Sequence, residues 1–222
     1  MKSIKKVPQR CVCTHKKKNV KGLIMKIIAG VHKGMPIKCS KGLNTRPTSA
    51  RIREAVMSMV SDKLHNSVFF DLFSGSGAMG LEALSRGAKS VLFVENGKEA
   101  IKVLQKNCAE IERRFNRLEM ACGKIKLIPK ELSSSLKTIE YSENADIIWA
   151  DPPYSITKDW TQSIFVSKLS NLINENGVFL LEAASSDLAQ IHLDQKYWEK
   201  VKDRKYGSTS VGIWRRNHFR EE

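Results

Sequence analysis

A glycine-rich turn between an apolar run and a helical stretch is the feature that most constrains the fold of this 222-residue chain. Residues 71–80 read Asp-Leu-Phe-Ser-Gly-Ser-Gly-Ala-Met-Gly and contain the pattern G-x-G-x-x-G. The acidic residue Glu95 ends the next apolar run. In α/β folds such glycines let the backbone approach a nucleotide-like ligand, and the acidic residue holds its ribose. By itself the pattern fits NAD and S-adenosylmethionine equally well.

The alternation of apolar runs and helical stretches predicts a doubly wound sheet. Strands are expected at 68–72, 90–95, 125–128, 145–150 and 177–182, and helices near 77–86, 97–115, 131–140 and 159–175. Apolar runs with little alternation are typical of parallel strands that are buried on both faces. Two later runs, 198–205 and 210–215, predict a closing antiparallel pair. We therefore expect an α/β, Rossmann-like fold with a mostly parallel seven-stranded sheet.

Positive charge is concentrated at the start of the chain. The formal net charge is +15, yet residues 1–53 contain no Asp or Glu. We expect residues 1–24 to be a basic disordered tail, either an addition or a start assigned too early. We expect residues 25–66 to be a small hairpin, with strands at 26–30 and 35–39, followed by a helix, and residues 67–222 to be the main domain. Clustered Lys and Arg favour a polyanion partner because they release counterions from phosphates.

The predicted helix after residue 48 begins with Thr48 or Ser49 as a cap and carries a core-facing apolar stripe. Arg51 and Arg53 are expected to project away from that stripe. No apolar run approaches the ~18 residues that span a membrane. The five cysteines show no disulfide pattern, which favours a reducing compartment, and Cys11-Val12-Cys13 lacks the second ligand pair of a zinc site. We expect a cytoplasmic chain with no metal.

A second motif lies where the strand at 145–150 ends. Asp151-Pro152-Pro153-Tyr154 should reach the same sheet edge as the glycine-rich turn, since ligands bind at the carboxyl ends of parallel strands. The prolines fix the backbone, so that the Asp151 carboxylate and the Pro152 carbonyl can accept hydrogen bonds from a planar amino group. Tyr154 offers a face for base stacking. Asp71 would repel a pyrophosphate and attract an ammonium group, which favours S-adenosylmethionine over NAD.

Three segments resemble the RsmD family, the 16S rRNA (guanine(966)-N(2))-methyltransferases of bacteria. They are Arg46-Pro47-Thr48 with residues 51–54, the turn at 71–80 with its extension Leu-Glu-Ala-Leu-Ser-Arg-Gly-Ala at 81–88, and residues 151–154. The likeness spans residues 25–216. It implies a monomeric enzyme that uses S-adenosyl-L-methionine to methylate a guanine amine of 16S rRNA in the small ribosomal subunit.

The resemblance also implies roles for individual residues. The residues expected to bind the cofactor are Asp71, Phe73, Ser74, Gly75, Gly77, Glu95 and Glu131. Those expected to bind the target base and catalyse the transfer are Asp151, Pro152, Pro153 and Tyr154. Those expected to bind RNA are Arg46, Thr48, Arg51 and Arg53. Ala50 stands where the family usually has Asp, and Glu131-Leu132 where it tends to have Asn or Asp. The latter departure leaves the adenine contacts open.

Three alternatives remain at the level of sequence. Methyltransferases for DNA adenine or protein glutamine use a similar tetrapeptide, although the glutamine enzymes usually have Asn at the first position. An NAD-dependent oxidoreductase would explain the glycines but gives residues 151–154 no role. A catalytically idle RNA-binding protein would explain the charge alone.

Overall fold

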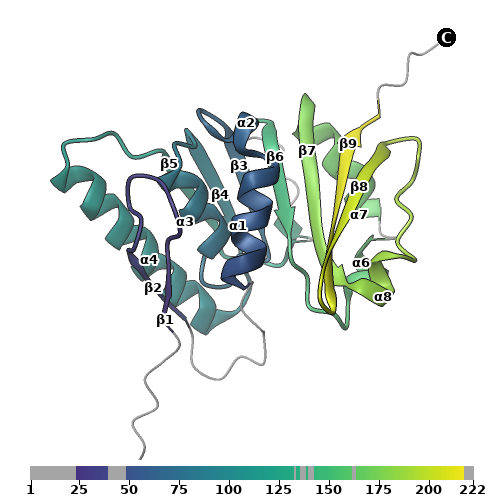
Figure 1. Ribbon diagram of the computed structural model, residues 1–222, viewed down its shortest axis with the longest axis horizontal. Helices are drawn as coiled ribbons and strands as arrows, with labels where there is room; N and C mark the ends of the chain where they lie inside the picture. Colours follow the sequence, from purple (N-terminus) through teal and green to yellow (C-terminus); the bar gives the residue numbers. More distant parts are fainter. Residues whose placement is uncertain are drawn as a thin grey trace, which may run out of the picture.

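The computed structural model describes residues 24–39, 49–132, 134–135, 139, 143–161 and 164–217, and its centre is a seven-stranded sheet. The strand order is β5-β4-β3-β6-β7-β9-β8; the pairs β7·β9 and β8·β9 are antiparallel and the other four are parallel (Figure 1). The strands are β3 Val68–Leu72, β4 Ser90–Val94, β5 Lys124–Ile128, β6 Ala145–Ala150, β7 Ile173–Ala184, β8 Trp198–Tyr206 and β9 Thr209–Arg216. The predicted α/β fold with a mostly parallel seven-stranded sheet is confirmed.

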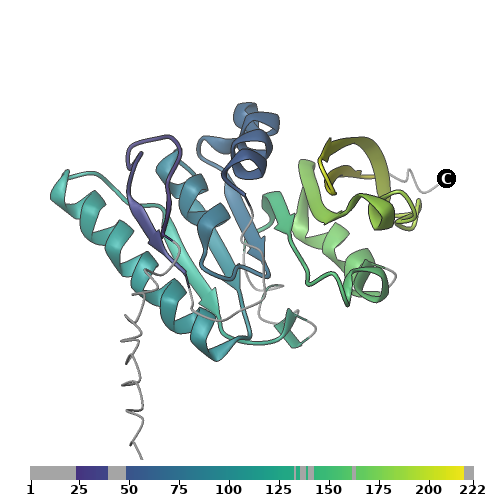
Figure 2. The same cartoon turned by 60° about the horizontal axis from the view of Figure 1, so that its bottom comes forward.

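Helices cover both faces of the sheet (Figure 2). They are α1 Ala50–Met59, α2 Ser61–Leu64, α3 Ala78–Ser85, α4 Lys98–Arg117, α6 Thr157–Thr161, α7 Ile164–Leu169, the 3-10 helix η1 Ser170–Leu172 and α8 Ser185–Leu188. Apolar residues of α1, α3 and α4 form one buried cluster with the face of the sheet that bears Phe69 and Trp149. Apolar residues of α7 and α8 form another with the opposite face, which bears Phe70 and Ile148. Within the described ranges, no helix is long and apolar enough to cross a membrane.

The predicted helix over 159–175 is wrong in its last three residues, 173–175, and its remainder is divided into shorter helices. Helices α6 and α7 and the turn η1 occupy this stretch only as far as Leu172, and β7 begins at Ile173. Ile173 pairs with Ala145 of β6, and the register then shifts before Ile147 pairs with Val178. The polar residues between the two pairings form a bulge in a strand that is buried before and after it. Tertiary pairing therefore overrides the local helical pattern.

The N-terminal hairpin is present, with strands displaced from the predicted positions. Strand β1 spans Ile24–Lys26 and pairs with β2, Pro36–Lys38, so the connection runs over residues 27–35. Apolar residues of this segment, such as Ile27 and Met35, belong to the same buried cluster as Phe69 of β3. The hairpin is thus a part of the main hydrophobic core. The predicted tail at 1–24 lies outside the described residues except for Ile24.

Candidate cofactor and acceptor site

The glycine-rich turn connects β3 to α3 at the carboxyl edge of the sheet. Its conformation needs glycine at two points: Gly77 has φ +81°, and a Cβ there would approach Leu104 Cδ1 of α4 to 2.3 Å. At Gly80 a Cβ would lie 2.3 Å from Phe93 Cε1, because α3 packs closely on β4. Phe73 adopts φ +61°, a left-handed conformation that a bulky residue rarely takes. The turn is therefore a tightly specified loop held against the sheet.

Hydrogen bonds from the turn reach the end of β4. The Gly75 amide donates to Glu95 Oε2 at 2.7 Å, and the Gly97 amide donates to Glu95 Oε1 at 2.7 Å. The Ser74 hydroxyl donates to the carbonyl of Asp71 at 2.5 Å. Of the predicted cofactor residues, Ser74, Gly75 and Glu95 are therefore brought together at the end of β4.

Asp71 is almost completely buried at this edge, being 1% exposed. Its Oδ2 accepts a hydrogen bond from the Gly80 amide at 2.9 Å. Burial raises the pKa of the Asp71 carboxyl well above its ordinary value, and the nearby charges of Asp151 and Glu95 raise it further. A buried carboxylate beside two other carboxylates is most stable when a cation lies against it.

The loop that follows β6 lies beside this turn. Asp71 pairs in register with Trp149 of the neighbouring strand β6, and Asp151 follows two residues later, just past the end of that strand. The Pro153 carbonyl accepts from the Ile156 amide at 3.0 Å and the Thr157 hydroxyl at 3.1 Å, which makes the loop rigid. Pro152 is buried, whereas Pro153 is exposed.

Tyr154 presents its ring to solvent while its hydroxyl is held. The side chain is 48% exposed, and its Oη lies 3.2 Å from Thr209 Oγ1 at the start of β9. An exposed aromatic ring that is fixed at one end has the form of a stacking platform. The same bond joins the loop after β6, residues 151–156, which we call the acceptor loop, to the β8–β9 hairpin.

Glu182 belongs to this edge, and the sequence analysis gave it no role. It lies near the carboxyl end of β7, where Leu181 pairs with Ala150 of β6, so it stands opposite Asp151. It is 5% exposed. The signal was available, since an acidic residue ended the apolar run 177–182, but only the strand order places that run beside β6.

The RNA-binding prediction for the first helix is corrected in one residue. Arg51 is exposed, near the start of α1. Arg53 is 1% exposed, and its Nη2 donates to the Lys26 carbonyl at 3.0 Å, so the expectation that it projects away from the core is wrong. Arg53 lies off the stripe that begins at Ile52 and is buried instead against Met25 and Lys26 of β1. Arg46 and Thr48 lie outside the described residues; the cap is Ser49, whose Oγ accepts from the Ile52 amide at 3.2 Å.

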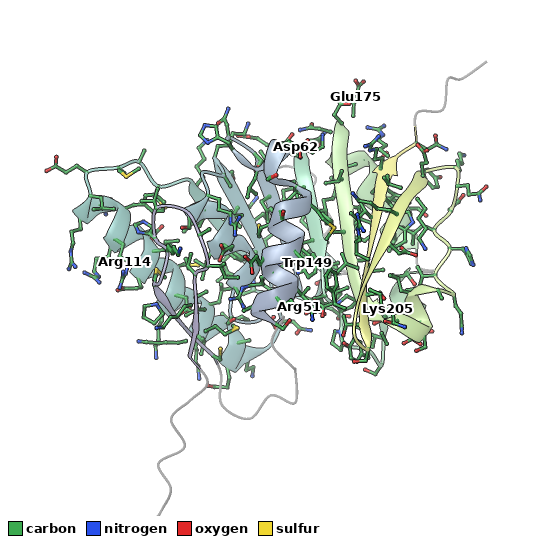
Figure 3. The ribbon with its side chains drawn as sticks, in the orientation of Figure 1. Arg51, Asp62, Arg114, Trp149, Glu175 and Lys205 are labelled. Carbon is green, nitrogen blue, oxygen red and sulfur yellow. The ribbon has the colours of Figure 1, made fainter. Side chains whose placement is uncertain are left out.

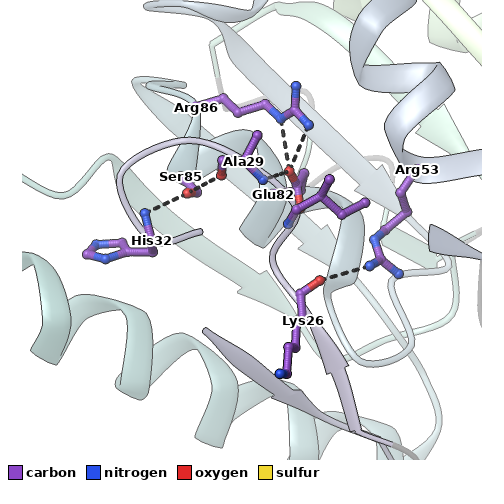
Figure 4. A network of polar contacts seen from close by, with 8 residues as sticks. Lys26, Ala29, His32, Arg53, Glu82, Ser85 and Arg86 are labelled. Carbon is purple, nitrogen blue, oxygen red and sulfur yellow. Dashed lines mark hydrogen bonds and ion pairs between the residues drawn. The ribbon is translucent and has the colours of Figure 1, made fainter. Parts of the chain in front are cut away.

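The extension at 81–88 holds the hairpin against α3 (Figure 4). Glu82, fully buried, accepts hydrogen bonds from the amides of Ile28 at 2.8 Å and Ala29 at 2.9 Å, and pairs with Arg86 at 2.9 Å. The Ser85 hydroxyl accepts from the His32 amide at 2.9 Å and donates to the Ala29 carbonyl at 2.7 Å. These contacts use the amides of Ile28 and Ala29, so the connection of the hairpin is bonded to α3.

Asn107 of α4 links the hairpin to the glycine-rich turn. Its side-chain amide donates to the carbonyls of Lys38 and Ser76, each at 2.9 Å, and its oxygen accepts from the Lys38 amide at 3.1 Å. The sequence offered one sign of this role, because Asn107 is a polar residue at a buried position of the helix between Leu104 and Ile111. Asn107 therefore connects β2 of the hairpin to the glycine-rich turn.

Glu131 lies three residues beyond β5, at the same sheet edge. Its side chain is exposed, and its carbonyl accepts from the hydroxyls of Ser134 at 2.9 Å and Ser135 at 2.7 Å. The described contacts of Glu131 are thus local backbone contacts. Its assignment to the cofactor stays a prediction.

Comparison with known proteins gives consistent similarities. Residues 25–215 match the family model described as Conserved hypothetical protein 95. The chain is 28% identical to Ribosomal RNA small subunit methyltransferase D of Haemophilus influenzae, over 88% of this chain and 95% of that one. It is 30% identical to the protein of the same name from Buchnera aphidicola subspecies Baizongia pistaciae, over 85% and 90% of the two chains.

The fold has matching solved structures as well. The yhhF structure from Escherichia coli, described as a proposed methyltransferase, superposes with a TM-score of 0.69 at 21% identity. The match covers 87% of this chain and 98% of that chain.

Proposed function

The chain belongs to the family described as Conserved hypothetical protein 95, the RsmD family, and from that premise we propose that it transfers a methyl group from S-adenosylmethionine to the exocyclic N2 of a guanine in 16S rRNA. The observation that carries the proposal is the meeting of two loops at one sheet edge. One loop is backed by buried Asp71 and the other begins with Asp151.

The residues of the first loop fit a cationic cofactor. S-adenosylmethionine supplies an electrophilic methyl group on a sulfonium centre and also carries an α-ammonium group. Asp71 would pair with the ammonium, Glu95 would accept from the ribose hydroxyls, and Gly75 has open space where a Cβ would stand. The pyrophosphate of NAD would meet the charges of Asp71, Glu95 and Asp151, which repel it.

The residues of the second loop fit a primary aromatic amine. The lone pair of such a nitrogen is delocalised into the ring, so the amine is a poor nucleophile. Acceptance of its two N–H bonds by the Asp151 carboxylate and the Pro152 carbonyl favours localisation of the lone pair and stabilises the positive charge that develops on nitrogen. Pro153 is not the second acceptor in this proposal, because its carbonyl is bonded within the loop.

The chemical step then balances as a simple displacement. The nitrogen lone pair forms the new N–C bond while the S–C bond breaks and its electron pair returns to sulfur. The amine loses one proton, for which the Asp151 carboxylate is the nearest proposed acceptor. Stacking on Tyr154 holds the base in line for this transfer.

Guanine is favoured over adenine by the character of the acceptor site. Guanine presents two neighbouring donors, N1–H and the N2 amino group, whereas adenine presents an acceptor at N1 beside its amino group. Asp151 and the adjacent Glu182 are both acidic, and two prolines remove amide donors from the loop. An acceptor-rich site of this kind supports the guanine assignment.

Thermal melting tests the cofactor part of the proposal. S-adenosylhomocysteine at 100 times its Kd should stabilise the protein by about 2.7 kcal/mol, and NAD should not. A rise in Tm with NAD alone would refute the assignment and favour an oxidoreductase.

Methyl transfer from labelled cofactor to small subunits that lack the modification tests the reaction. Asp151→Ala should remove transfer, and Asp159→Ala, at an exposed position of α6, should leave it unchanged. Equal activity of the two variants would contradict the role of Asp151.

A further inference from the structure

The edge strand β8 carries a row of exposed cations that the RNA-binding assignment does not include. From Glu199 to Lys205 every side chain of β8 is exposed. Four of these seven residues are basic, namely Lys200, Lys202, Arg204 and Lys205. The strand is the outermost of the sheet, on the side opposite β5.

The register divides these cations between the two faces of the sheet. Lys202 pairs with Ile213 and Arg204 with Val211, and directly opposed residues of antiparallel strands point to the same face. Ile213 and Val211 belong to the cluster that also contains Trp149 and Phe93. Lys202 and Arg204 therefore point to the face that bears Asp71 and Glu182.

The two residues also align with the acceptor loop across the sheet. Val211 pairs on its other side with Glu182, which stands opposite Asp151. Arg204, Val211, Glu182 and Asp151 thus form one cross-strand row, and three strand spacings correspond to about 14 Å between the backbones at its ends. This distance corresponds to one or two nucleotides of an RNA strand, so Arg204 could contact a phosphate close to a base that stacks on Tyr154.

The β8–β9 hairpin is fixed relative to that loop. Tyr206 pairs with Thr209, whose hydroxyl is bonded to Tyr154. Figure 3 shows Lys205 and Arg51 at the lower end of the molecule, with Glu175 and Asp62 at the upper end. Since Glu175 lies near the start of β7, the lower end is the carboxyl edge, where the acceptor loop lies.

Lys202 and Arg204 differ in their partners from Lys200, which lies on the other face of the sheet. Lys200 pairs with Asp203 at 2.8 Å and lies 5.4 Å from the centre of the Trp214 ring. Among the described side chains, Lys202 and Arg204 form no ion pair. Same-face positions on a strand repeat at about 6.6 Å, which suits two phosphates along one nucleic-acid strand.

We propose that Lys202 and Arg204 bind the phosphate backbone of the RNA strand whose base enters the acceptor site. The inference rests on the proposed function for its ligand and adds a second contact surface, separate from α1. The target base would then lie between Arg51 on α1 and the basic face of β8.

A competing explanation is protection of a sheet edge. Exposed lysines and bulges keep edge strands from pairing with other chains, and β8 has a register shift between Lys200 and Lys202. Under that explanation neutral variants associate with one another, and their affinity for RNA stays the same.

Binding of a 16S rRNA transcript at several salt concentrations separates these explanations. The double variant Lys202→Gln/Arg204→Gln is compared with Lys106→Gln/Arg117→Gln on α4, where one exposed Lys and one exposed Arg are likewise lost. Each phosphate contact contributes about 0.7 to the slope of log K against log salt and about fivefold to affinity at ~0.1 M salt. The β8 variant should therefore lose about 25-fold in affinity and about 1.4 in slope.

The control variant should stay within about twofold of the original protein in RNA affinity. Both variants should keep the Tm and the affinity for S-adenosylhomocysteine. An unchanged slope in the β8 variant overturns the inference, with or without self-association. RNA binding through β8 in a protein that transfers no methyl group would instead defeat the proposed function and leave this contact standing.

Discussion

Replacement of Glu82 by glutamine tests how firmly the hairpin is joined to the catalytic sheet. The carboxylate, fully buried, accepts two backbone amides and pairs with Arg86. Glutamine keeps one acceptor oxygen and turns the other into a donor that faces either an amide or a guanidinium group. Hydrogen bonds to charged groups contribute about 1.5–3 kcal/mol each, and breaking a buried pair costs about 3–5 kcal/mol. We expect the free energy of unfolding to fall by about 3 kcal/mol.

Urea unfolding measures this loss, with an unchanged m-value as the sign that only stability has changed. Glu110→Gln is the matched control, because Glu110 is likewise a carboxylate paired with arginine, here Arg113 and Arg114, but on the exposed side of α4. Exposed pairs of this kind contribute at most about 1 kcal/mol. A loss in Glu82→Gln no larger than that in Glu110→Gln would refute the anchoring role.

Three further substitutions divide stability from function. The pKa of Asp71 is raised in the folded state, so its ionisation lowers the stability of the protein. This loss is complete above the folded pKa and absent below the unfolded pKa. In urea unfolding at neutral pH, Asp71→Asn should therefore raise the free energy of unfolding by on the order of 1 kcal/mol. In calorimetry, S-adenosylhomocysteine should bind the original protein more weakly as pH falls and Asp71→Asn weakly at every pH; equal tight binding by both would contradict the pairing. Tyr154→Ala should lower turnover by about 5- to 150-fold with unchanged cofactor affinity, and Tyr154→Phe much less, since the ring provides about 1–3 kcal/mol of stacking; parallel loss of turnover and affinity would make Tyr154 a packing residue. Arg53→Met should lose about 2 kcal/mol of stability and Arg51→Met under about 0.5, while only Arg51→Met lowers RNA affinity at full stability; the reverse pattern would show that the burial of Arg53 is unimportant.

Much of the sheet could be predicted because its strands are apolar on both sides. Runs such as Val68–Leu72 and Ala145–Ala150 have no polar face, so their place inside a covered sheet follows from composition. The glycine-rich turn was equally readable, since the conformation at Gly77 and the packing at Gly80 exclude larger residues. These features depend on local sequence.

The errors arose where long-range contacts decide the structure. Arg53 was expected on the surface because it lies off the apolar stripe of its helix, yet in the structure it is buried and its guanidinium donates to the Lys26 carbonyl. Ile173 was placed in a helix because its pairing with Ala145 is not visible in sequence. The place of Glu182 beside the end of β6 needed the strand order, which no local pattern supplies.

Identification of the methylated nucleoside tests the central claim most directly. Small ribosomal subunits that lack the modification are incubated with the protein and methyl-labelled S-adenosylmethionine, and their 16S rRNA is digested to nucleosides and separated. The account predicts that label appears in N2-methylguanosine and in no other nucleoside, and that Asp151→Ala gives none. Label in an adenosine, or no label in any nucleoside despite cofactor binding, would contradict it.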